Sequence, residues 1–167
     1  LKAGCFHQVS SIAAAGLYDG TFTEDMFEEA GAMDHPYFLT KHESEGLVRA
    51  ETKMNWRIYR PGMVVGHSAT GDMDKVDGPY YFFETLKNLS SVVPEGLPLL
   101  LNKAGLLNIV PVDYVVNAID YLAHLPKHDQ ECFFITDPDG TRVGDLLKTM
   151  MKVSGGPKLK AVDVGIL

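Results

Sequence analysis

Hydrophobic positions along this chain fall into two alternating patterns. Short apolar runs bounded by polar residues or glycine predict strands at residues 5–9, 55–59, 106–110 and 131–136. Apolar residues at a helical spacing predict helices at residues 35–53, 80–89, 112–125 and 141–153. Strands that alternate with helices are typical of an α/β fold built on a parallel sheet. We therefore expect such a sheet, with a smaller region attached to it.

The connections between these elements have their own composition. Residues 19–34 are rich in glycine, threonine and acidic side chains, which predicts a surface loop. Residues 61–79 contain six glycines or prolines and are also expected to form a loop. Pro36 stands near the first turn of the helix predicted at residues 35–53, where its missing N–H does no harm. The last ten residues, 158–167, read as a strand or a linker.

Length and composition indicate one soluble globular domain. The chain has 167 residues, 46% of them hydrophobic, which is enough to bury a core. It has no apolar run long enough to cross a membrane and no signal-peptide pattern at its start, which favours the cytoplasm. Cys5 and Cys132 lie in apolar contexts and are expected to be buried thiols without a disulfide.

Charge narrows the range of partners. The net charge is −7 and the basic residues are scattered, which argues against a nucleic-acid or anionic-membrane surface. A phosphate group on a ligand would need local cations, for which the sequence offers Lys41, Arg60, Lys75 and Lys103. The histidines and cysteines have no metal-ligand spacing, so we predict no metal site.

A candidate proton-transfer site comes from Ser10, Ser11, Tyr37 and Lys41. Tyr37 and Lys41 are four residues apart in the helix predicted at residues 35–53, which puts them on one face. A fixed ammonium stabilises a neighbouring phenolate, and a phenol beside a cation is a better proton donor at neutral pH. The two serines follow a predicted strand. The alternative is an ordinary surface Tyr–Lys pair and a serine that satisfies a strand-end carbonyl.

With these residues in view, the chain resembles the extended short-chain dehydrogenase/reductase superfamily. Members of that superfamily use a Ser, a Tyr and a Lys in this order. The closer resemblance is to the thioester-reductase and fatty-acyl-reductase (male-sterility-like) branch. It rests on Tyr-Arg-Pro-Gly-Met-Val-Val-Gly at residues 59–66, His-Ser-Ala-Thr-Gly at residues 67–71 and Pro-Val-Asp-Tyr-Val-Val-Asn at residues 111–117.

The resemblance implies a role for each candidate residue. Tyr37 would protonate the oxygen of the carbonyl that is reduced, and Ser11 would donate a hydrogen bond to the same oxygen. Aligning Gly16 with the glycine that closes the family motif makes Ser11, and not Ser10, the catalytic serine. Lys41 would favour the Tyr37 phenolate and hold the nicotinamide ribose, so that Tyr37 and Lys41 also contact the cofactor. Asp113, which could simply cap the following helix, would be structural. The family loop beside the nicotinamide corresponds to Pro61, Gly62, Met63 and Val64.

The same resemblance implies a cofactor and a substrate class. The cofactor would be NADP or NAD, with NADP favoured. The substrate would be a small-molecule carbonyl or acyl thioester, carried on coenzyme A or a carrier protein, and reduced to an aldehyde or alcohol. The aromatic run at residues 80–83 is expected to pack in the core or to line an apolar substrate cavity.

One motif that the resemblance requires is missing from the sequence. The Gly-x-x-Gly-x-x-Gly turn that holds the cofactor pyrophosphate is absent, since Gly62, Gly66 and Gly71 have the wrong spacing. We therefore expect residues 1–167 to form the carboxyl-terminal part of a doubly wound, Rossmann-like parallel sheet with a small substrate-binding region. This part would be inactive alone, and its exposed sheet edge would favour a homodimer.

Three other functions compete with an acyl reductase. A nucleotide-sugar or sterol-type dehydrogenase or epimerase of the same superfamily would share the Ser, Tyr and Lys. A noncatalytic cofactor-binding or interaction module would not need them. A serine hydrolase is disfavoured because Gly-x-Ser-x-Gly is absent, and residues 66–71 miss that motif by one position.

Overall fold

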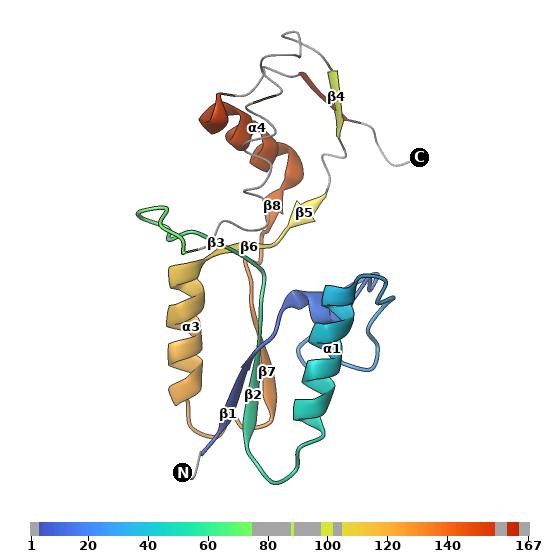
Figure 1. The fold of residues 1–167 in the computed structure, drawn as a ribbon, viewed down its shortest axis with the longest axis vertical. Coiled ribbons are helices and arrows are strands. Elements are labelled where there is room, and N and C mark those ends of the chain that lie inside the picture. The colour runs from blue at the N-terminus through green and yellow to red at the C-terminus, as the bar shows by residue number, and fades with distance from the viewer. Residues whose placement is uncertain (1–3, 75–87, 89–97, 102–104, 156–159, 164–167) are drawn as a thin grey trace. The chain divides into compact units, whose positions relative to one another are not determined.

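The computed structural model of the chain describes residues 4–74, 88, 98–101, 105–155 and 160–163 (Figure 1). The chain forms two compact units. The first unit comprises Leu1–Thr70 and Val110–Asp137, and the second comprises Gly71–Ile109 and Pro138–Leu167. The candidate serine, tyrosine and lysine all belong to the first unit.

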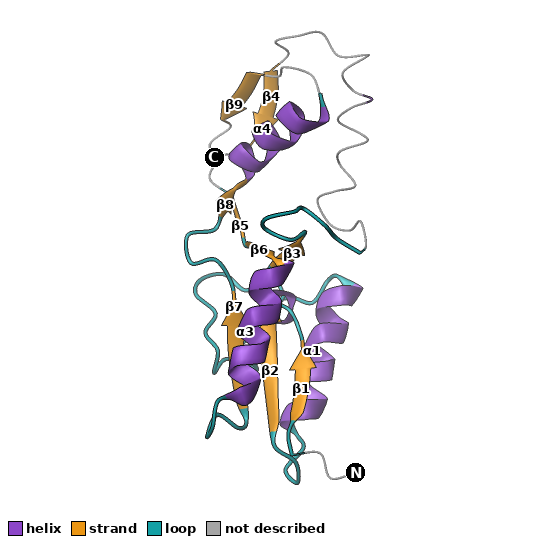
Figure 2. Ribbon diagram, turned by 90° about the vertical axis from the view of Figure 1, so that its left-hand side faces the viewer, coloured by secondary structure: helices purple, strands orange, loops and turns teal. Residues whose placement is uncertain are grey.

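The first unit is built on a parallel sheet of three strands. Strands β1 (Phe6–Val9), β2 (Trp56–Pro61) and β7 (Glu131–Ile135) lie in the order β1-β2-β7, and both pairings are parallel. Helices α1 (Pro36–Arg49) and α3 (Val112–His124) cover opposite faces of this sheet (Figures 1 and 2). The predicted α/β fold with a parallel, Rossmann-like sheet is confirmed.

The two faces of the sheet carry separate cores because side chains alternate along a strand. On the α3 face, Tyr59 and Ile135 pack with Val115 and with the inward side of that helix. On the α1 face, Trp56, Ile58 and Cys132 pack against Val48 of α1. All six residues of β2 are buried, as expected of a strand covered on both faces.

Several predicted boundaries change in the structure. The short 3-10 helix η1 (Ile12–Ala15) follows the serines, and the predicted 61–79 loop contains strand β3 (Met63–Val65). The single strand predicted at residues 106–110 is two strands, β5 (Leu106–Leu107) and β6 (Ile109–Pro111). Strand β3 pairs with β6. Helix α1 ends at Arg49, four residues before the predicted end.

In its described residues, the second unit contains two small strand ladders and helix α4. Strand β4 (Pro98–Leu101) pairs in parallel with β9 (Lys160–Asp163), and β5 pairs antiparallel with β8 (Thr141–Arg142). Helix α4 (Val143–Ser154) ends at Gly155, which has the left-handed backbone common after a helix. Most of the predicted 80–89 helix, the aromatic run at residues 80–83, Lys75 and Lys103 lie outside the described residues.

An apolar run such as that of residues 5–9 is typical of a buried strand, but β1 is partly exposed. Phe6 is 42% exposed and Val9 is 52% exposed, because β1 has a neighbour on one side only in the described sheet. A strand at the edge of a sheet presents unpaired N–H and C=O groups along its open side.

Both cysteines are free thiols. Cys132 is buried in the α1-side core, and this burial raises its pKa to about 11. The group therefore stays protonated at neutral pH. Of the helices in the described part of the chain, none combines the length and the apolar character needed to cross a bilayer.

Residues 17–34 form a closed loop between η1 and α1, which we call the acidic loop. It contains six carboxylates and no lysine or arginine. Its base is closed by two backbone hydrogen bonds, from Leu17 N to Ala32 O at 3.0 Å and from Gly31 N to Ala15 O at 2.9 Å. A Cβ atom on Gly31 would lie 2.4 Å from the carbonyl carbon of Leu17, so only glycine fits there.

The Gly31→Ala substitution should therefore force the base of the acidic loop apart. We expect it to lower the free energy of unfolding by about 1–3 kcal/mol, the usual cost of an inserted methyl without space. Urea titration followed by the fluorescence of Trp56, the single tryptophan and a residue of the buried core, measures the free energy of unfolding. Gly4→Ala is the matched control, since a Cβ there meets nothing within 4 Å. Equal midpoints for both variants would contradict the prediction.

His7 gives the first unit a pH dependence. Its Nδ1 lies 2.9 Å from the Tyr59 hydroxyl and its ring stacks on the Tyr59 ring. Burial, and then the positive charge of Arg57, lower the pKa of His7 below the ordinary 6.5. The folded state therefore binds fewer protons than the unfolded state below pH 6.5. The resulting contribution of His7 to the free energy of unfolding is complete above pH 6.5. It is lost as the pH falls toward the lower pKa that His7 has in the folded state.

In His7→Phe, which keeps an aromatic ring but cannot titrate, the loss of stability on acidification should be smaller. Urea midpoints of both proteins at pH 8, 6.5 and 5.5 measure the slope. The pH 8 values isolate the packing difference, because an imidazole with the ordinary or a lower pKa is neutral there. An identical slope in the two proteins would refute this role for His7.

Candidate functional site

The two serines sit where β1 ends. Ser10 and Ser11 are buried, and the backbone N–H of Ser10 donates to the carbonyl of Tyr59 at 2.7 Å. Ser11 caps η1, because its Oγ accepts a hydrogen bond from Ala13 N at 3.2 Å. This contact fixes the hydroxyl but uses only a lone pair, so its proton remains able to donate to a carbonyl oxygen. The Ser10 hydroxyl has no hydrogen-bond partner within the described residues.

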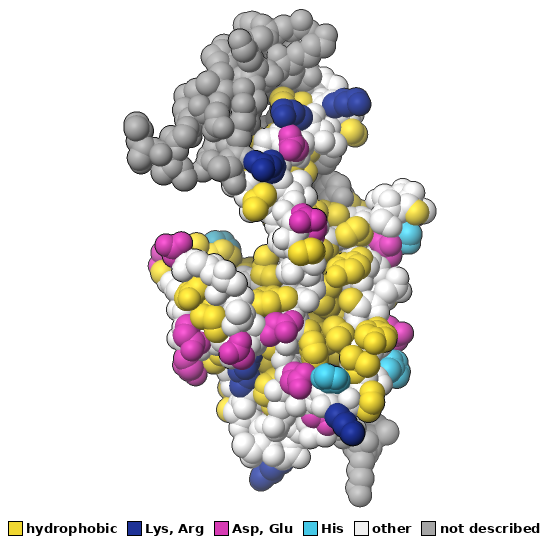
Figure 3. All heavy atoms as spheres, turned by 180° about the vertical axis from the view of Figure 1, so that it is seen from behind, with side chains coloured by type: hydrophobic (Ala, Val, Ile, Leu, Met, Phe, Trp, Pro, Cys, Tyr) yellow, Lys and Arg dark blue, Asp and Glu magenta, His cyan; other side chains and the backbone are white. Residues whose placement is uncertain are grey.

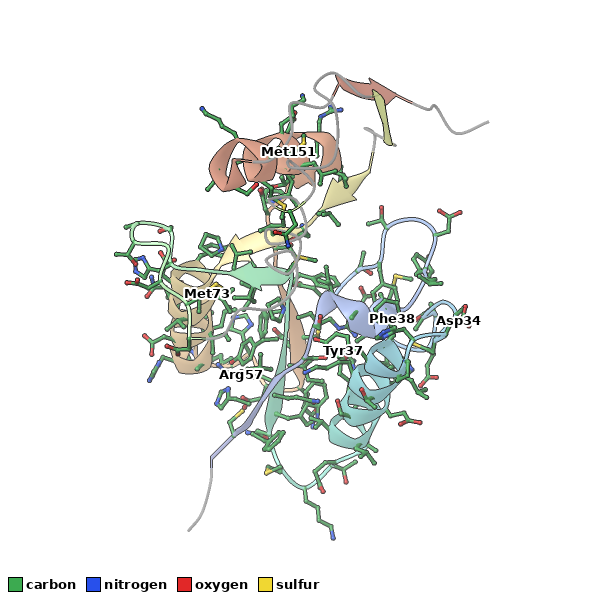
Figure 4. All side chains as sticks on the ribbon, turned by 45° about the horizontal axis from the view of Figure 1, so that its top comes forward. Asp34, Tyr37, Phe38, Arg57, Met73 and Met151 are labelled. Carbon is green, nitrogen blue, oxygen red and sulfur yellow. The ribbon has the colours of Figure 1, made fainter. Side chains whose placement is uncertain are left out.

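Tyr37 stands in the first turn of α1. His35 caps this helix with its side chain, whose Nδ1 accepts from Tyr37 N at 3.1 Å, and Pro36 occupies the first helical position. Tyr37 lies on the sheet-facing side of the helix, and Asp34 lies on the outer side (Figure 4). The side chain is partly open, with 47% of the residue exposed. A phenol in this position is held by the helix start and accessible to a ligand.

Lys41 connects the tyrosine helix to the serine strand. Its Nζ lies 5.8 Å from the centre of the Tyr37 ring, so the two residues share a face as their spacing predicts. The same Nζ donates to the carbonyl of Val9 at 3.3 Å, immediately before Ser10. An ammonium has three donors, and this bond uses one. Lys41 can therefore hold β1, face Tyr37 and still donate to ligand hydroxyls.

Helix α1 is fixed to the sheet by two further polar contacts. Gln8 Nε2 donates to Ser44 Oγ at 2.9 Å. Arg60, at the end of β2, pairs with Glu45: Arg60 Nη2 lies 2.8 Å from Glu45 Oε2, and Nε lies 3.1 Å from Oε1. Both side chains of this pair are 0% exposed. The face of α1 that carries Tyr37 and Lys41 is thus the face that docks on the sheet.

The burial of Arg60 corrects one expectation from the sequence. Arg60 was a candidate for binding a ligand phosphate, but its guanidinium is fully buried and satisfied by protein groups. It is not available to a ligand. The charge of Arg60 is visible in the sequence but its burial is not, because its anion, Glu45, lies fifteen residues away on α1.

The candidate nicotinamide loop starts at the same edge of the sheet as the serines. Val9 and Tyr59 are register partners in adjacent parallel strands. Ser10–Ser11 follow the carboxyl end of β1, and Pro61 ends β2 and leads into Gly62–Val64 at the same edge. Gly62 N donates to Ile135 O at 3.0 Å, which holds the loop against β7. Met63 and Val64 are exposed. In open parallel sheets, ligands bind at this edge.

Asp113 holds the segment that follows β3. It accepts hydrogen bonds from Ser68 N at 2.8 Å and from Ser68 Oγ at 2.7 Å. These two bonds hold the pKa of Asp113 below its usual range. The sequence suggested that Asp113 caps α3, but that helix has no side-chain cap; the carboxylate instead fastens the 66–70 segment. No local pattern predicts this pairing, because Ser68 and Asp113 are 45 residues apart.

The site contains groups that fit a nicotinamide cofactor and no group of metal ligands. Lys41 has donors left for ribose hydroxyls, and Pro61, Gly62, Met63 and Val64 form a mainly apolar segment at the same edge of the sheet. Across the part of the chain that the structure describes, no three His, Cys, Asp or Glu side chains come together as a metal site would require.

Comparisons with known proteins agree with this geometry. Residues 1–119 match the NAD-binding family described as male sterility protein. The chain is 30% identical over 160 residues to an aldehyde reductase, LnbA, of Aspergillus flavus. The matched region covers 89% of this chain and 15% of that protein. The chain therefore spans a minor part of the length of that relative.

Solved structures give the same result. The terminal R domain from the myxalamid PKS-NRPS biosynthetic pathway is 25% identical with a TM-score of 0.72, over 95% of this chain and 39% of that one. UDP-glucose 4-epimerase of Thermotoga maritima is 24% identical with a TM-score of 0.63, over 95% of this chain and 50% of that one, and shows the shared fold. The chain belongs to the male sterility protein family, an NAD-binding branch of the extended short-chain dehydrogenases/reductases.

Proposed function

We propose that this chain carries the catalytic residues of an NAD(P)H-dependent reductase that converts an acyl thioester, or a related carbonyl, to an aldehyde or alcohol. The observation that carries the proposal is Lys41, whose ammonium faces Tyr37 and also binds the carbonyl that precedes the two serines. One cation thus brings a phenol and a fixed hydroxyl to the same edge of the sheet. These are the groups that carbonyl reduction requires from a protein.

The bound cofactor supplies hydride to the carbonyl carbon. Tyr37 gives its phenolic proton to the carbonyl oxygen as that carbon is reduced. Ser11 donates a hydrogen bond to the same oxygen and stabilises the charge that develops on it. With a thioester, the product of this step is a hemithioacetal, whose collapse breaks the C–S bond and releases an aldehyde and a thiol. A second round on the aldehyde yields an alcohol.

Lys41 has two roles in this scheme. Its charge favours the phenolate that Tyr37 becomes after proton transfer. Its remaining donors are suited to the ribose hydroxyls of the cofactor, which would orient the nicotinamide against Pro61–Val64. The choice between the two cofactors falls to residues that contact the adenosine end; we favour NADP.

We further propose that the chain is the carboxyl-terminal part of a larger reductase domain. Three observations support this: the glycine-rich pyrophosphate motif is absent from the sequence, the solved R domain is more than twice as long, and β1 exposes Phe6 and Val9 on the open edge of the described sheet. The missing strands would pair with β1 and hold the pyrophosphate. The sequence and intact mass of the native polypeptide test this, because a full domain must contain that motif.

The substrate is proposed to be delivered on coenzyme A or a carrier protein. Support comes from the similarity to the terminal R domain from the myxalamid PKS-NRPS biosynthetic pathway. A nucleotide-sugar dehydrogenase or epimerase is the alternative, and the epimerase match supports it through the fold alone. A noncatalytic module would retain Lys41 as a structural tie but would need neither phenol nor hydroxyl.

Removing the Tyr37 hydroxyl tests the proposed acid. In the complete reductase, Tyr37→Phe should lower the turnover number by about 10²–10⁴-fold, the usual contribution of a positioned general acid. Consumption of NADPH or NADH with octanoyl-coenzyme A and with octanal as probes measures this, and Trp56 fluorescence confirms folding. Tyr121→Phe, on the exposed surface of α3, is the matched control and should keep its turnover. Unchanged turnover in Tyr37→Phe would remove the proposed acid.

A further inference from the structure

The buried guanidinium of Arg60 contacts helix α1, which carries Tyr37, and the acidic loop that leads into this helix. We propose that Arg60 is a positioning residue for the reaction: by binding Glu45 and the acidic loop together, it sets the Tyr37 phenol against the Ser11 hydroxyl. This inference rests on the proposed function of Tyr37 and goes beyond it, since Arg60 itself contacts no ligand.

Arg60 joins three segments through one planar group. From its place on β2 it binds α1 through both carboxylate oxygens of Glu45. The outer nitrogens of the same guanidinium donate to two carbonyls of the acidic loop, from Nη2 to Met26 O at 3.1 Å and from Nη1 to Thr23 O at 3.5 Å. Strand, helix and loop therefore share one buried charge.

Aromatic rings enclose this charge. The guanidinium carbon lies 5.2 Å from the ring centre of Phe22 and 5.4 Å from that of Phe134. Phe22 comes from the acidic loop and Phe134 from β7. A second anchor lies beside them, because Glu24 Oε1 accepts a hydrogen bond from Phe134 N at 2.7 Å. The loop is thus held at two points on the sheet.

The carboxylates of the acidic loop do not form the pair with Arg60. In the rear view, acidic side chains gather on the side of the first unit that carries α1 and the loop (Figure 3). Six carboxylates are available in residues 17–34, yet Arg60 takes its anion from α1 and only carbonyls from the loop. This division makes Arg60 a bridge between α1 and the loop, and not a local neutralising charge.

The bridge controls both catalytic groups through short connections. Glu45 follows Tyr37 by eight residues, about two turns of one rigid helix, and Lys41 lies between them on the same side. The loop that Arg60 holds connects η1, which Ser11 caps, to the first turn of α1. A shift of the loop or of the Glu45 end of the helix therefore changes the spacing of phenol and hydroxyl.

Lysine cannot reproduce this arrangement. An arginine presents five donors in a rigid plane, which here face Glu45 on one side and two carbonyls on another, while its flat faces stack on rings. The ammonium of a lysine keeps the charge, but all its donors are on one nitrogen atom and it has no flat face. Arg60→Lys therefore preserves the charge of the pair and removes its geometry.

The test uses the complete reductase with octanoyl-coenzyme A or octanal as the probe. Arg60→Lys should lower the turnover number by about 10–100-fold, as displacements near 1 Å do in active sites, while the KM of the cofactor stays within about twofold. Arg57→Lys is the matched control. Arg57 is a second buried arginine of β2, on the opposite face, and donates to the carbonyls of Leu122 and Leu125 at the end of α3. It should lower the urea midpoint and keep the turnover number.

A double-mutant cycle with Tyr37→Phe separates positioning from folding. If Arg60 acts through Tyr37, Arg60→Lys lowers turnover in the native background and has little further effect in Tyr37→Phe. An equal fold reduction of the turnover number in both backgrounds would overturn the proposal, and so would an equal reduction in Arg57→Lys. Unchanged turnover in Tyr37→Phe alone would refute the proposed function and this inference together, whereas a large loss there with none in Arg60→Lys would refute the inference only.

Glu24→Ala keeps the proposal testable if Arg60→Lys does not fold. Glu24 is exposed and anchors the same loop through Phe134 N. Its removal should lower turnover several-fold with folding intact, and Glu24→Gln, which retains an acceptor oxygen, should recover most of that loss. Native turnover in Glu24→Ala would show that the position of the loop does not control the reaction.

Discussion

The buried ion pair of Arg60 and Glu45 is the constraint on which the rest of the site depends. Both side chains are fully buried, and removing a charge from water costs several kcal/mol unless its partners satisfy it. Here the guanidinium is satisfied by a carboxylate, two carbonyls and two aromatic faces. These partners come from three segments, helix α1, the acidic loop and strand β7. The charge on β2 can therefore be satisfied only when all three segments are in place. Apolar packing alone would tolerate small shifts of these segments more readily.

The residues to which we assign the reaction lie at the carboxyl edge of the parallel sheet, and Lys41 connects them. The register of β1 and β2 brings the serines and the Pro61–Val64 loop to that edge. The lysine then ties the tyrosine helix to the last carbonyl of β1, with a single bond that leaves donors for a ligand. Structural and chemical roles thus meet in one side chain, which is why the pair of Tyr37 and Lys41 is oriented before any cofactor binds.

Sequence patterns predicted the parts of this protein that depend on local order. The apolar stripe of residues 112–125 predicted helix α3, and the four-residue spacing of Tyr37 and Lys41 predicted that they share a helix face. The predictions that were wrong concern features that depend on residues remote in sequence. The exposure of Phe6 and Val9 reflects the position of β1 at the edge of the described sheet, and β3 pairs with β6, which lies more than forty residues away. Arg60 was interpreted as a free cation because its charge is visible in the sequence and its burial is not. Asp113 was interpreted as a cap because Ser68 is remote in sequence.

The most direct test of the central claim is a crystal structure of the complete reductase with NADPH bound. The account predicts the Lys41 Nζ within hydrogen-bond distance of the nicotinamide ribose hydroxyls, the nicotinamide against Pro61–Val64, and the Tyr37 and Ser11 oxygens facing its reactive carbon. A nicotinamide bound beyond the reach of Lys41, with Tyr37 and Ser11 turned away from it, would contradict the account.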